Sequence, residues 1–231
     1  MQGELFKRRG GARPGAGRPR ITDRRASEHH KVRAKVTRHQ PLHVVVRVAR
    51  DLGSLRSKAA YLAIRTATAQ AFGSSAFRIV HLSIQRTHIH LIVEANDRMK
   101  LARGMQGFLI SAARHLNRAL GREGNVFADR YHATALTCPA QVRNTLAYVM
   151  NNWRHHHEHL KQYTSEWKVD PFSTATSFEG WSELDGRRFE EVRPSYLPMI
   201  VTSAASWLLR IGWKRRGLIS FHFVPGGAHA E

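Results

Sequence analysis

Apolar and polar positions along the middle of the chain recur with two different periods, and these periods predict the elements of the fold. Residues 42–48 are rich in β-branched side chains, which is typical of a strand. Residues 54–72 carry apolar side chains at roughly helical spacing and are followed by Gly73, a frequent residue at helix ends. Residues 77–85 and 89–93 have the composition of two further strands, joined by a short turn.

The pattern continues with a long helix, a short strand and a last helix. Asp97 can cap a helix that runs to about residue 120, where Gly121 closes it. Residues 131–137 form a short strand candidate. Residues 139–156 are expected to form a helix whose first turn holds a proline.

The resulting order of elements is β-α-β-β-α-β-α, and its first six members match the ferredoxin-like split βαβ pattern. The predicted fold class is therefore α+β: an antiparallel sheet with helices on one face, to which the final helix is an addition. Beyond residue 160 the pattern is weak. Residues 171–181 are expected to form a loop and residues 199–209 a helix.

Charge changes this picture by dividing the chain into three parts. The 231 residues carry 37 Lys and Arg against 17 Asp and Glu, a formal net charge of +20. Residues 1–40 hold +9 and are rich in Gly, Arg and Pro, so they are expected to form a flexible basic arm. Residues 41–159, with +10, are expected to form a folded domain, the one that carries the candidate catalytic residues described below, and residues 160–231, with +1, an extension of unknown role. Such a charge favours an acidic partner, of which nucleic acid is the commonest.

Cysteine content and hydropathy exclude several classes of protein. A single cysteine, Cys138, rules out a disulfide framework and a four-cysteine zinc site. The longest apolar stretch, 197–213, is interrupted by polar and charged residues and is too short for a bilayer span. We therefore expect a soluble, cytoplasmic protein with no membrane partner.

A His-Ile-His triplet begins the strand predicted over 89–93. Side chains alternate faces along a strand, so His88 and His90 point the same way while Ile89 points into the core. Two imidazoles on one sheet face can hold a metal ion. The alternative is coincidence, because the chain has 15 histidines and such triplets also arise from composition alone.

Tyr148 is the second candidate, because it lies away from the apolar side of the last predicted helix. Asn152 follows it by one helical turn, so its amide can approach the same place. A core tyrosine would lie on the apolar stripe, and the alternative for Tyr148 is an ordinary surface side chain. That stripe consists of Val142, Leu146, Val149, Met150 and Trp153.

These residues together indicate a particular chemistry. A phenol is a weak nucleophile, and it becomes effective when the electrophile is polarised and the leaving group is stabilised. A divalent ion bound by His88, His90 and the amide oxygen of Asn152 would polarise a phosphodiester in this way. Tyr148 would then supply the attacking oxygen. Imidazole ligands by themselves favour zinc or another transition metal.

Three segments resemble a known family over about residues 40–157. The segments HIHLIVE, NVFADRYHATAL and LAYVMNNWRHH are similar to those of the single-tyrosine HUH transposases of the IS200 type. The likeness is closest to the branch of REP-associated tyrosine transposases. It rests on the histidine triplet, the Arg130-Tyr131 pair and the Tyr-x-x-x-Asn helix. Two positions depart from the branch: Arg86-Thr87 precedes the first histidine in place of Pro-Asn, and Trp153 replaces the proline after Asn152.

The resemblance implies a ferredoxin-like fold, with His88, His90 and Asn152 as ligands of Mg²⁺ or Mn²⁺ and Tyr148 as the nucleophile. It also implies cleavage and rejoining of single-stranded, hairpin-forming DNA through a 5′-phosphotyrosine with a free 3′-hydroxyl. The family likeness further implies a homodimer.

Several basic residues are candidates for DNA contacts. Arg18 and Arg20 lie in GARPGAGRPR, which resembles an AT-hook core that enters a narrow minor groove; the alternative is a merely basic tail. Arg114 and Arg118 on the long helix, together with Arg130, are expected to contact phosphates.

Other polar and aromatic residues have a structural and a functional interpretation. Glu94 is either a general base or, as we expect, a surface charge at a strand end. His81 and His132 are expected to be structural rather than part of the site. Four tryptophans either stack on bases or, as we expect, pack in the core: Trp167, Trp181, Trp207 and Trp213.

Two other functions remain open at this stage. One is a DNA-binding regulator that has the fold and charge without the chemistry. The other is an RNA-binding module, because positive charge does not distinguish RNA from DNA.

Overall fold

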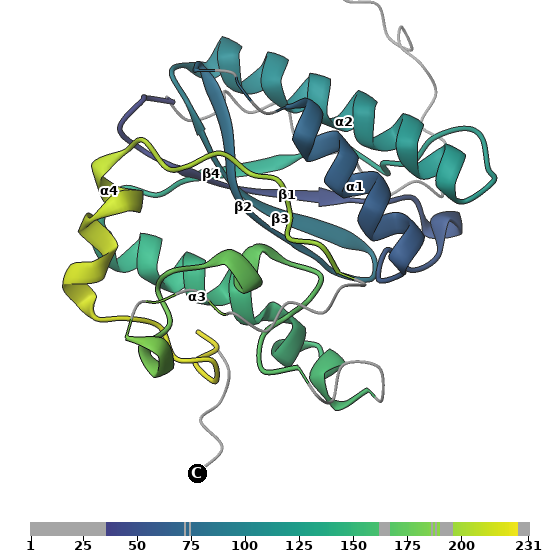
Figure 1. The fold of residues 1–231 in the computed structure, drawn as a ribbon. Coiled ribbons are helices and arrows are strands. Elements are labelled where there is room, and N and C mark those ends of the chain that lie inside the picture. Colours follow the sequence, from purple (N-terminus) through teal and green to yellow (C-terminus); the bar gives the residue numbers. More distant parts are fainter. Residues whose placement is uncertain are drawn as a thin grey trace, which may run out of the picture. The chain divides into compact units, whose positions relative to one another are not determined.

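An antiparallel sheet forms the centre of the protein in the computed structural model (Figure 1). Within the described residues it has four strands, in the spatial order β2-β3-β1-β4. The strands are β1 (Leu42–Arg47), β2 (Phe77–Ile84), β3 (His88–Ala95) and β4 (His132–Ala135). Every neighbouring pair is antiparallel, so the predicted ferredoxin-like α+β class is confirmed.

The structure describes residues 36–71, 73, 75–161, 167–185, 187, 189 and 196–225. These residues belong to one unit of the chain, 32–231. Most of the predicted arm, including Arg18 and Arg20, lies outside the described residues.

Two helices cover one face of the sheet and a third covers the other (Figure 1). Helices α1 (Lys58–Gln70) and α2 (Arg98–Ala119) pack on the first face, as predicted. The Asp97 side chain accepts a hydrogen bond from the Lys100 amide at 2.8 Å and so caps α2. Helix α3 (Pro139–His155), the added element, lies on the opposite face.

Alternation along the strands produces a separate core on each face. Ile89, Leu91 and Val93 of β3 are fully buried against α1 and α2. Ile92 points the other way, into a second core that contains the apolar stripe of α3.

The C-terminal extension completes this second core. Buried aromatic side chains from the extension pack around α3, among them Phe178, Trp181 and Trp213. The predicted helix over 199–209 is wrong. Only Trp207–Arg210 (α4) is α-helical there, and Gly212–Arg216 (η5) is a 3-10 helix. The preceding residues run beside β2, where the Thr202 amide donates to the Ile79 carbonyl oxygen.

The extension bonds to the outer edge of β2 at several points. The Ile84 amide donates to the Phe172 carbonyl oxygen at 2.9 Å. The Thr174 hydroxyl accepts from the Leu82 amide at 3.2 Å and lies within hydrogen-bonding distance of its carbonyl oxygen. With the Thr202 bond, these contacts satisfy polar groups that an edge strand would otherwise leave bare.

No helix in the described part of the chain is long and apolar enough to cross a membrane.

Candidate active site

The histidine triplet forms the first three residues of β3, directly after the hairpin turn. The hairpin turn that precedes it is closed by the Gln85 amide, which donates to the His88 carbonyl oxygen at 2.9 Å. His88 and His90 lie on the face that α3 covers, with ring centroids 4.7 Å apart, whereas Ile89 is buried on the other face. Strand alternation therefore places the two imidazoles side by side, as the sequence predicts.

Helix α3 brings Tyr148 to these imidazoles. The Tyr148 ring is half-buried and lies 5.2 Å from the His90 ring, edge to face. The two residues are 58 positions apart in sequence, and only the packing of α3 on the sheet joins them. The structure thus unites the candidate nucleophile with the histidine triplet.

Asn152 lies between Tyr148 of α3 and His156, the residue that follows α3, and the rings of both approach the histidines. Tyr148, one turn before it, contacts His90, and His156, one turn after it, lies 5.7 Å from His88 between ring centroids. The Asn152 side chain is 0 % exposed, and within the described structure neither Oδ1 nor Nδ2 has a hydrogen-bond partner. A buried amide without partners costs free energy, so this amide is a candidate for binding a ligand atom.

His43 of β1 is a member of the site that the sequence interpretation missed. Its Nε2 lies 3.1 Å from Nδ1 of His90, a hydrogen bond between strands, and its ring is 6.1 Å from that of Tyr148. This bond leaves Nε2 of His90 buried and without a partner among the described residues. The signal was present, since His43 interrupts an apolar strand at an alternate position, but its proximity to His90 depends on the pairing of β1 with β3.

Burial keeps the imidazoles neutral. Desolvation lowers the pKa of His43 to about 4, with a smaller contribution from His132. The pKa of His88 is lowered to about 4, mainly by burial and further by His156 and Arg47. That of His90 is lowered to about 2, mainly by burial and further by the neighbouring histidines His88, His43 and His156. Neutral imidazole is the form that binds metal ions. Burial also raises the pKa of Tyr148, so the free protein holds a phenol rather than a phenolate at neutral pH.

The donor atoms of this cluster are of kinds that bind divalent metal ions. Among the described residues no group of three or more His, Cys, Asp or Glu is placed to hold one. The candidate set is instead two imidazoles and one amide. Two atoms of this set, Nε2 of His90 and Oδ1 of Asn152, are buried and have no hydrogen-bond partner among the described residues. Each has a lone pair that can bind a metal ion.

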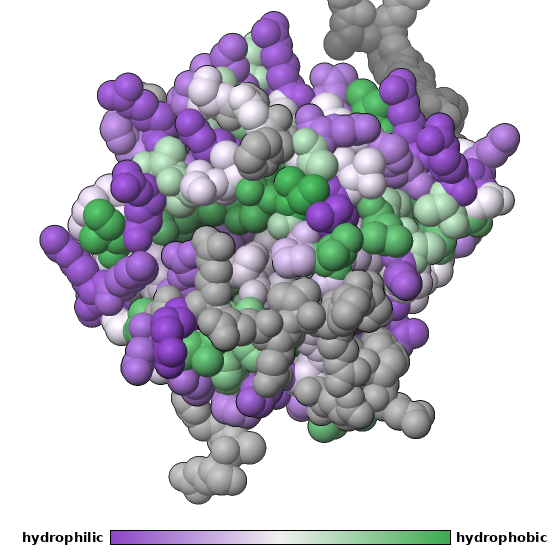
Figure 2. All heavy atoms as spheres, in the orientation of Figure 1, coloured by the Kyte–Doolittle hydropathy of each residue, from purple (hydrophilic) through white to green (hydrophobic). Residues whose placement is uncertain are grey.

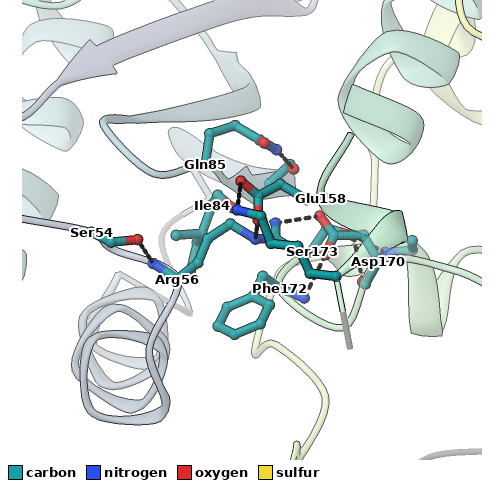
Figure 3. A network of polar contacts seen from close by, with 11 residues as sticks. Ser54, Arg56, Ile84, Gln85, Glu158, Asp170, Phe172 and Ser173 are labelled. Atoms are coloured by element: carbon teal, nitrogen blue, oxygen red, sulfur yellow. Dashed lines mark hydrogen bonds and ion pairs between the residues drawn. The ribbon is translucent and has the colours of Figure 1, made fainter. Parts of the chain in front are cut away.

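A buried ionic network fixes the turn from which His88 projects (Figure 3). Arg56, just before α1, donates to both carboxylate oxygens of Asp170 at 2.8 and 3.0 Å. The same guanidinium donates to the Ile84 carbonyl oxygen at 2.9 Å, immediately before the turn. Glu158, which follows α3, lies 3.7 Å from Arg56. The network therefore joins the turn to the start of α1, the end of α3 and the extension.

The other predicted DNA contacts lie in two places. Arg130 is exposed in the loop before β4. This loop is bound to the end of β1, because the Ala128 amide donates to the carbonyl oxygen of Arg47. Arg47 in turn pairs with His88 of the neighbouring strand. Arg130 is therefore at the same end of the sheet as the histidines. Arg114 and Arg118 are exposed on α2, on the opposite face from Tyr148. Their part in binding DNA stays a prediction.

The residues expected to be structural divide into confirmed and corrected cases. His81 packs edge to face on Phe178 at 5.5 Å between centroids, as expected of a structural histidine. His132 is exposed on β4 and contributes to the lowered pKa of His43, so it is not a packed structural side chain. Glu94 is not a surface charge: it is buried and accepts hydrogen bonds from the amides of Ala205 and Ser206 at 2.7 and 2.8 Å. Three of the four tryptophans are buried as expected, and the exception, Trp207, is 46 % exposed.

Comparison with a solved structure supports the same fold. A REP-associated tyrosine transposase bound to a REP hairpin is 17% identical to this chain, with a TM-score of 0.50, over 77% of this chain and 96% of that one. A putative transposase from Deinococcus radiodurans R1 is 14% identical, with a TM-score of 0.34, over 60% of this chain and 95% of that one. No curated protein sequence matches the chain.

A family model described as "Transposase IS200 like" matches residues 36–152. This range runs from just before β1 to Asn152, so it includes both histidines and Tyr148. Because the match spans half of the chain, the protein belongs to the IS200-like transposase family.

Proposed function

We propose that this protein cleaves and rejoins single-stranded, hairpin-forming DNA through a covalent bond to Tyr148. One observation carries the proposal: Tyr148 lies beside His90, with 5.2 Å between the ring centroids, and Asn152, one turn further along α3, has a buried amide without a partner among the described residues. A nucleophile beside preformed donor atoms is the arrangement that phosphoryl transfer to a side chain requires.

In the proposed reaction the Tyr148 oxygen attacks the phosphorus of the scissile phosphodiester. The phenol loses its proton as the new oxygen–phosphorus bond forms, and the departing 3′ oxygen gains one. The products are a 5′-phosphotyrosine and a free 3′-hydroxyl. Attack of a 3′-hydroxyl on the phosphotyrosine reverses these steps and rejoins the strand.

His88, His90 and Asn152 would hold the divalent ion, Mg²⁺ or Mn²⁺, which when bound polarises the phosphate. His43 positions His90 through the bond to Nδ1, which leaves Nε2 as the ligand nitrogen. Arg47 and Arg130, exposed at the same end of the sheet, are suited to contact phosphates that flank the scissile one.

DNA is the proposed partner for three reasons. The chain belongs to a transposase family, its net charge is +20, and the structural relative is bound to a REP hairpin. Recognition of a hairpin and formation of a homodimer are also proposed, and both rest on the likeness to the family.

Tyr148→Phe provides the direct test. The variant keeps the ring but removes the nucleophile, so it should form no covalent adduct with a labelled, hairpin-bearing single-stranded oligonucleotide in Mn²⁺. The matched control is Tyr196→Phe, whose ring packs on Tyr61 and Phe172 in the other core. Adduct formation by Tyr148→Phe at the rate of the control would reject the proposed nucleophile.

The ligand assignment is tested in the same assay. His88→Ala combined with His90→Ala should abolish the adduct, and His43→Phe should raise the Mn²⁺ concentration needed for half-maximal adduct by about tenfold. Unchanged Mn²⁺ dependence would remove these residues from the metal site. Tight hairpin binding by the wild-type protein without nicking, with or without metal, would instead indicate a DNA-binding regulator.

A further inference from the structure

The last described segment, residues 196–225, carries an exposed tryptophan in a basic surface. This segment contains four Arg and Lys and no Asp or Glu, unlike the nearly neutral extension taken as a whole. Trp207 begins α4 and is 46 % exposed, and Ile211 one turn later is 50 % exposed. Apolar side chains exposed singly are ordinary on protein surfaces, but these two lie one turn apart and among basic residues.

The Trp207 ring is held in place rather than free to move. Its six-membered ring lies against Gly212, where an added Cβ would come within 2.7 Å of it, so only glycine leaves it room. The guanidinium of Arg215 lies over the ring, 5.0 Å from its centroid. The result is a stacked pair on the surface of η5.

Further basic side chains surround this pair. Lys214 and Arg216 of η5 are exposed, as is Arg210 at the end of α4. In Figure 2, strongly hydrophilic side chains project beside a small hydrophobic patch on the left of the molecule, where Figure 1 places α4. Aromatic rings among cations are the usual means of binding unpaired nucleic acid, because bases stack on the rings while phosphates contact the cations.

The basic turn is fixed to the helix that carries the candidate nucleophile. Arg143 of α3 donates from Nε to the Gly217 carbonyl oxygen and from Nη2 to that of Leu218, both at 2.9 Å. Arg143 precedes Tyr148 by five residues, about 7.5 Å of helical rise. A strand bound at η5 would thus be held in a fixed relation to Tyr148.

We propose that Trp207 and Arg215, with Lys214 and Arg216, form a second DNA site that binds an unpaired stretch of the substrate by stacking. Its residues lie beyond the range of the family match, 36–152, so the site belongs to the extension. The choice of DNA rests on the proposed function, whereas the stacking chemistry rests on the geometry of this surface.

The test compares the affinity of variants for oligothymidine, which cannot form a hairpin. With a labelled strand of about 20 nucleotides, Trp207→Ala should weaken binding by about fivefold to a hundredfold, the usual effect of losing one stacked base. The slope of log affinity against log salt should stay unchanged, because no charge is lost. Arg215→Ala combined with Lys214→Ala should also weaken binding, but with a slope smaller by about 0.7 for each lost phosphate contact.

Arg103→Ala is the matched control, because it removes one exposed charge from α2 on the far side of the sheet. Trp207→Phe keeps an aromatic ring and should retain most of the affinity, which separates stacking from a folding defect. Binding of oligothymidine by Trp207→Ala equal to that of wild type or of Arg103→Ala would overturn the proposal. Tighter binding of the matched oligouridine RNA would overturn its assignment to DNA.

The Tyr148 adduct assay on the labelled, hairpin-bearing single-stranded oligonucleotide gives an independent result. Loss of the proposed cleavage with Trp207-dependent oligothymidine binding intact would refute the function and leave this site standing. Tyr148-dependent cleavage together with oligothymidine binding that does not depend on Trp207 would refute only the second DNA site.

Discussion

The side chain of Asn152, a proposed metal ligand, is buried at a cost to stability. Both of its polar atoms are buried, and in the described structure neither has a partner. A buried, unsatisfied amide typically destabilises a fold by about 1–3 kcal/mol. A cation bound by Oδ1 would satisfy part of this amide, so the free and loaded proteins should differ in stability.

This arrangement predicts opposite effects of one substitution on stability and on activity. Asn152→Leu keeps nearly the same shape without polar atoms, so it should raise the free energy of unfolding of the metal-free protein by about 1 kcal/mol. It should also abolish the Tyr148 adduct. Urea titration and the adduct assay measure the two quantities. A loss of stability would show that the amide has a structural partner and would remove the ligand interpretation.

The residues of the site differ in how well the sequence could predict them. His88 and His90 are two apart in one strand, and Asn152 follows Tyr148 by one helical turn, so simple periodicity places each pair on a common face. His43 comes from another strand, and its position beside His90 requires the register of β1 against β3, which no local pattern contains. Glu94 was misjudged for the same reason, because its amide partners lie more than 100 residues later.

At the scale of elements, the contact between Arg56 and Asp170 holds the turn before β3 (Figure 3). Both side chains are buried, and Arg56 also stacks over the ring of Phe172 at 4.4 Å. Removing Asp170 leaves the buried guanidinium with its longer, 3.7 Å contact to Glu158, and breaking a buried pair typically costs about 3–5 kcal/mol.

Asp170→Ala should therefore lower the free energy of unfolding by about 3 kcal/mol in a urea titration. Arg56→Met combined with Asp170→Leu removes both charges and should cost clearly less than the single change. A single-variant loss below about 0.5 kcal/mol, the range of ordinary surface substitutions, would show that the pair contributes little.

Elements with strong local signals were predicted well, and elements that depend on distant contacts were not. Helix α2 begins at its Asp97 cap and ends just before Gly121, as predicted, because both signals act within one turn. The helix expected over 199–209 does not form, since its residues instead bond to the edge of β2 and to Glu94. The segment is apolar because it packs against the sheet, and an apolar run of this length looks the same in the sequence whether it is extended or helical.

At the scale of the whole molecule, buried histidines make stability depend on pH. Burial lowers the pKa of His81 to about 4, whereas an unfolded histidine titrates near 6.5. Below pH 6.5 the unfolded chain therefore binds a proton that the folded chain rejects. The stabilising contribution of the neutral ring is complete above about pH 6.5 and is lost as the pH falls toward 4.

His81→Gln removes this group without touching the histidines near Tyr148. Between about pH 7.5 and pH 4.5 the variant should lose about 2 kcal/mol less stability than the wild-type protein. The expected difference is smaller than the full pKa shift implies because the ring keeps some contact with solvent. Urea titrations at both pH values, on metal-free protein, give the comparison. An equal loss of stability on acidification in the variant and the wild-type protein would contradict the assigned role of His81.

The bonds that the extension makes to the outer edge of β2 have a consequence for the fate of damaged chains. The strand FRIVHLSI has high β-propensity and a single charge, the composition of segments that add to one another between molecules. Phe172, Thr174 and Thr202, from the far end of the chain, bond to that edge. Proteolysis between α3 and these residues would uncover it, and the clipped protein should then be prone to aggregation through β2 rather than remain dispersed as a shortened enzyme.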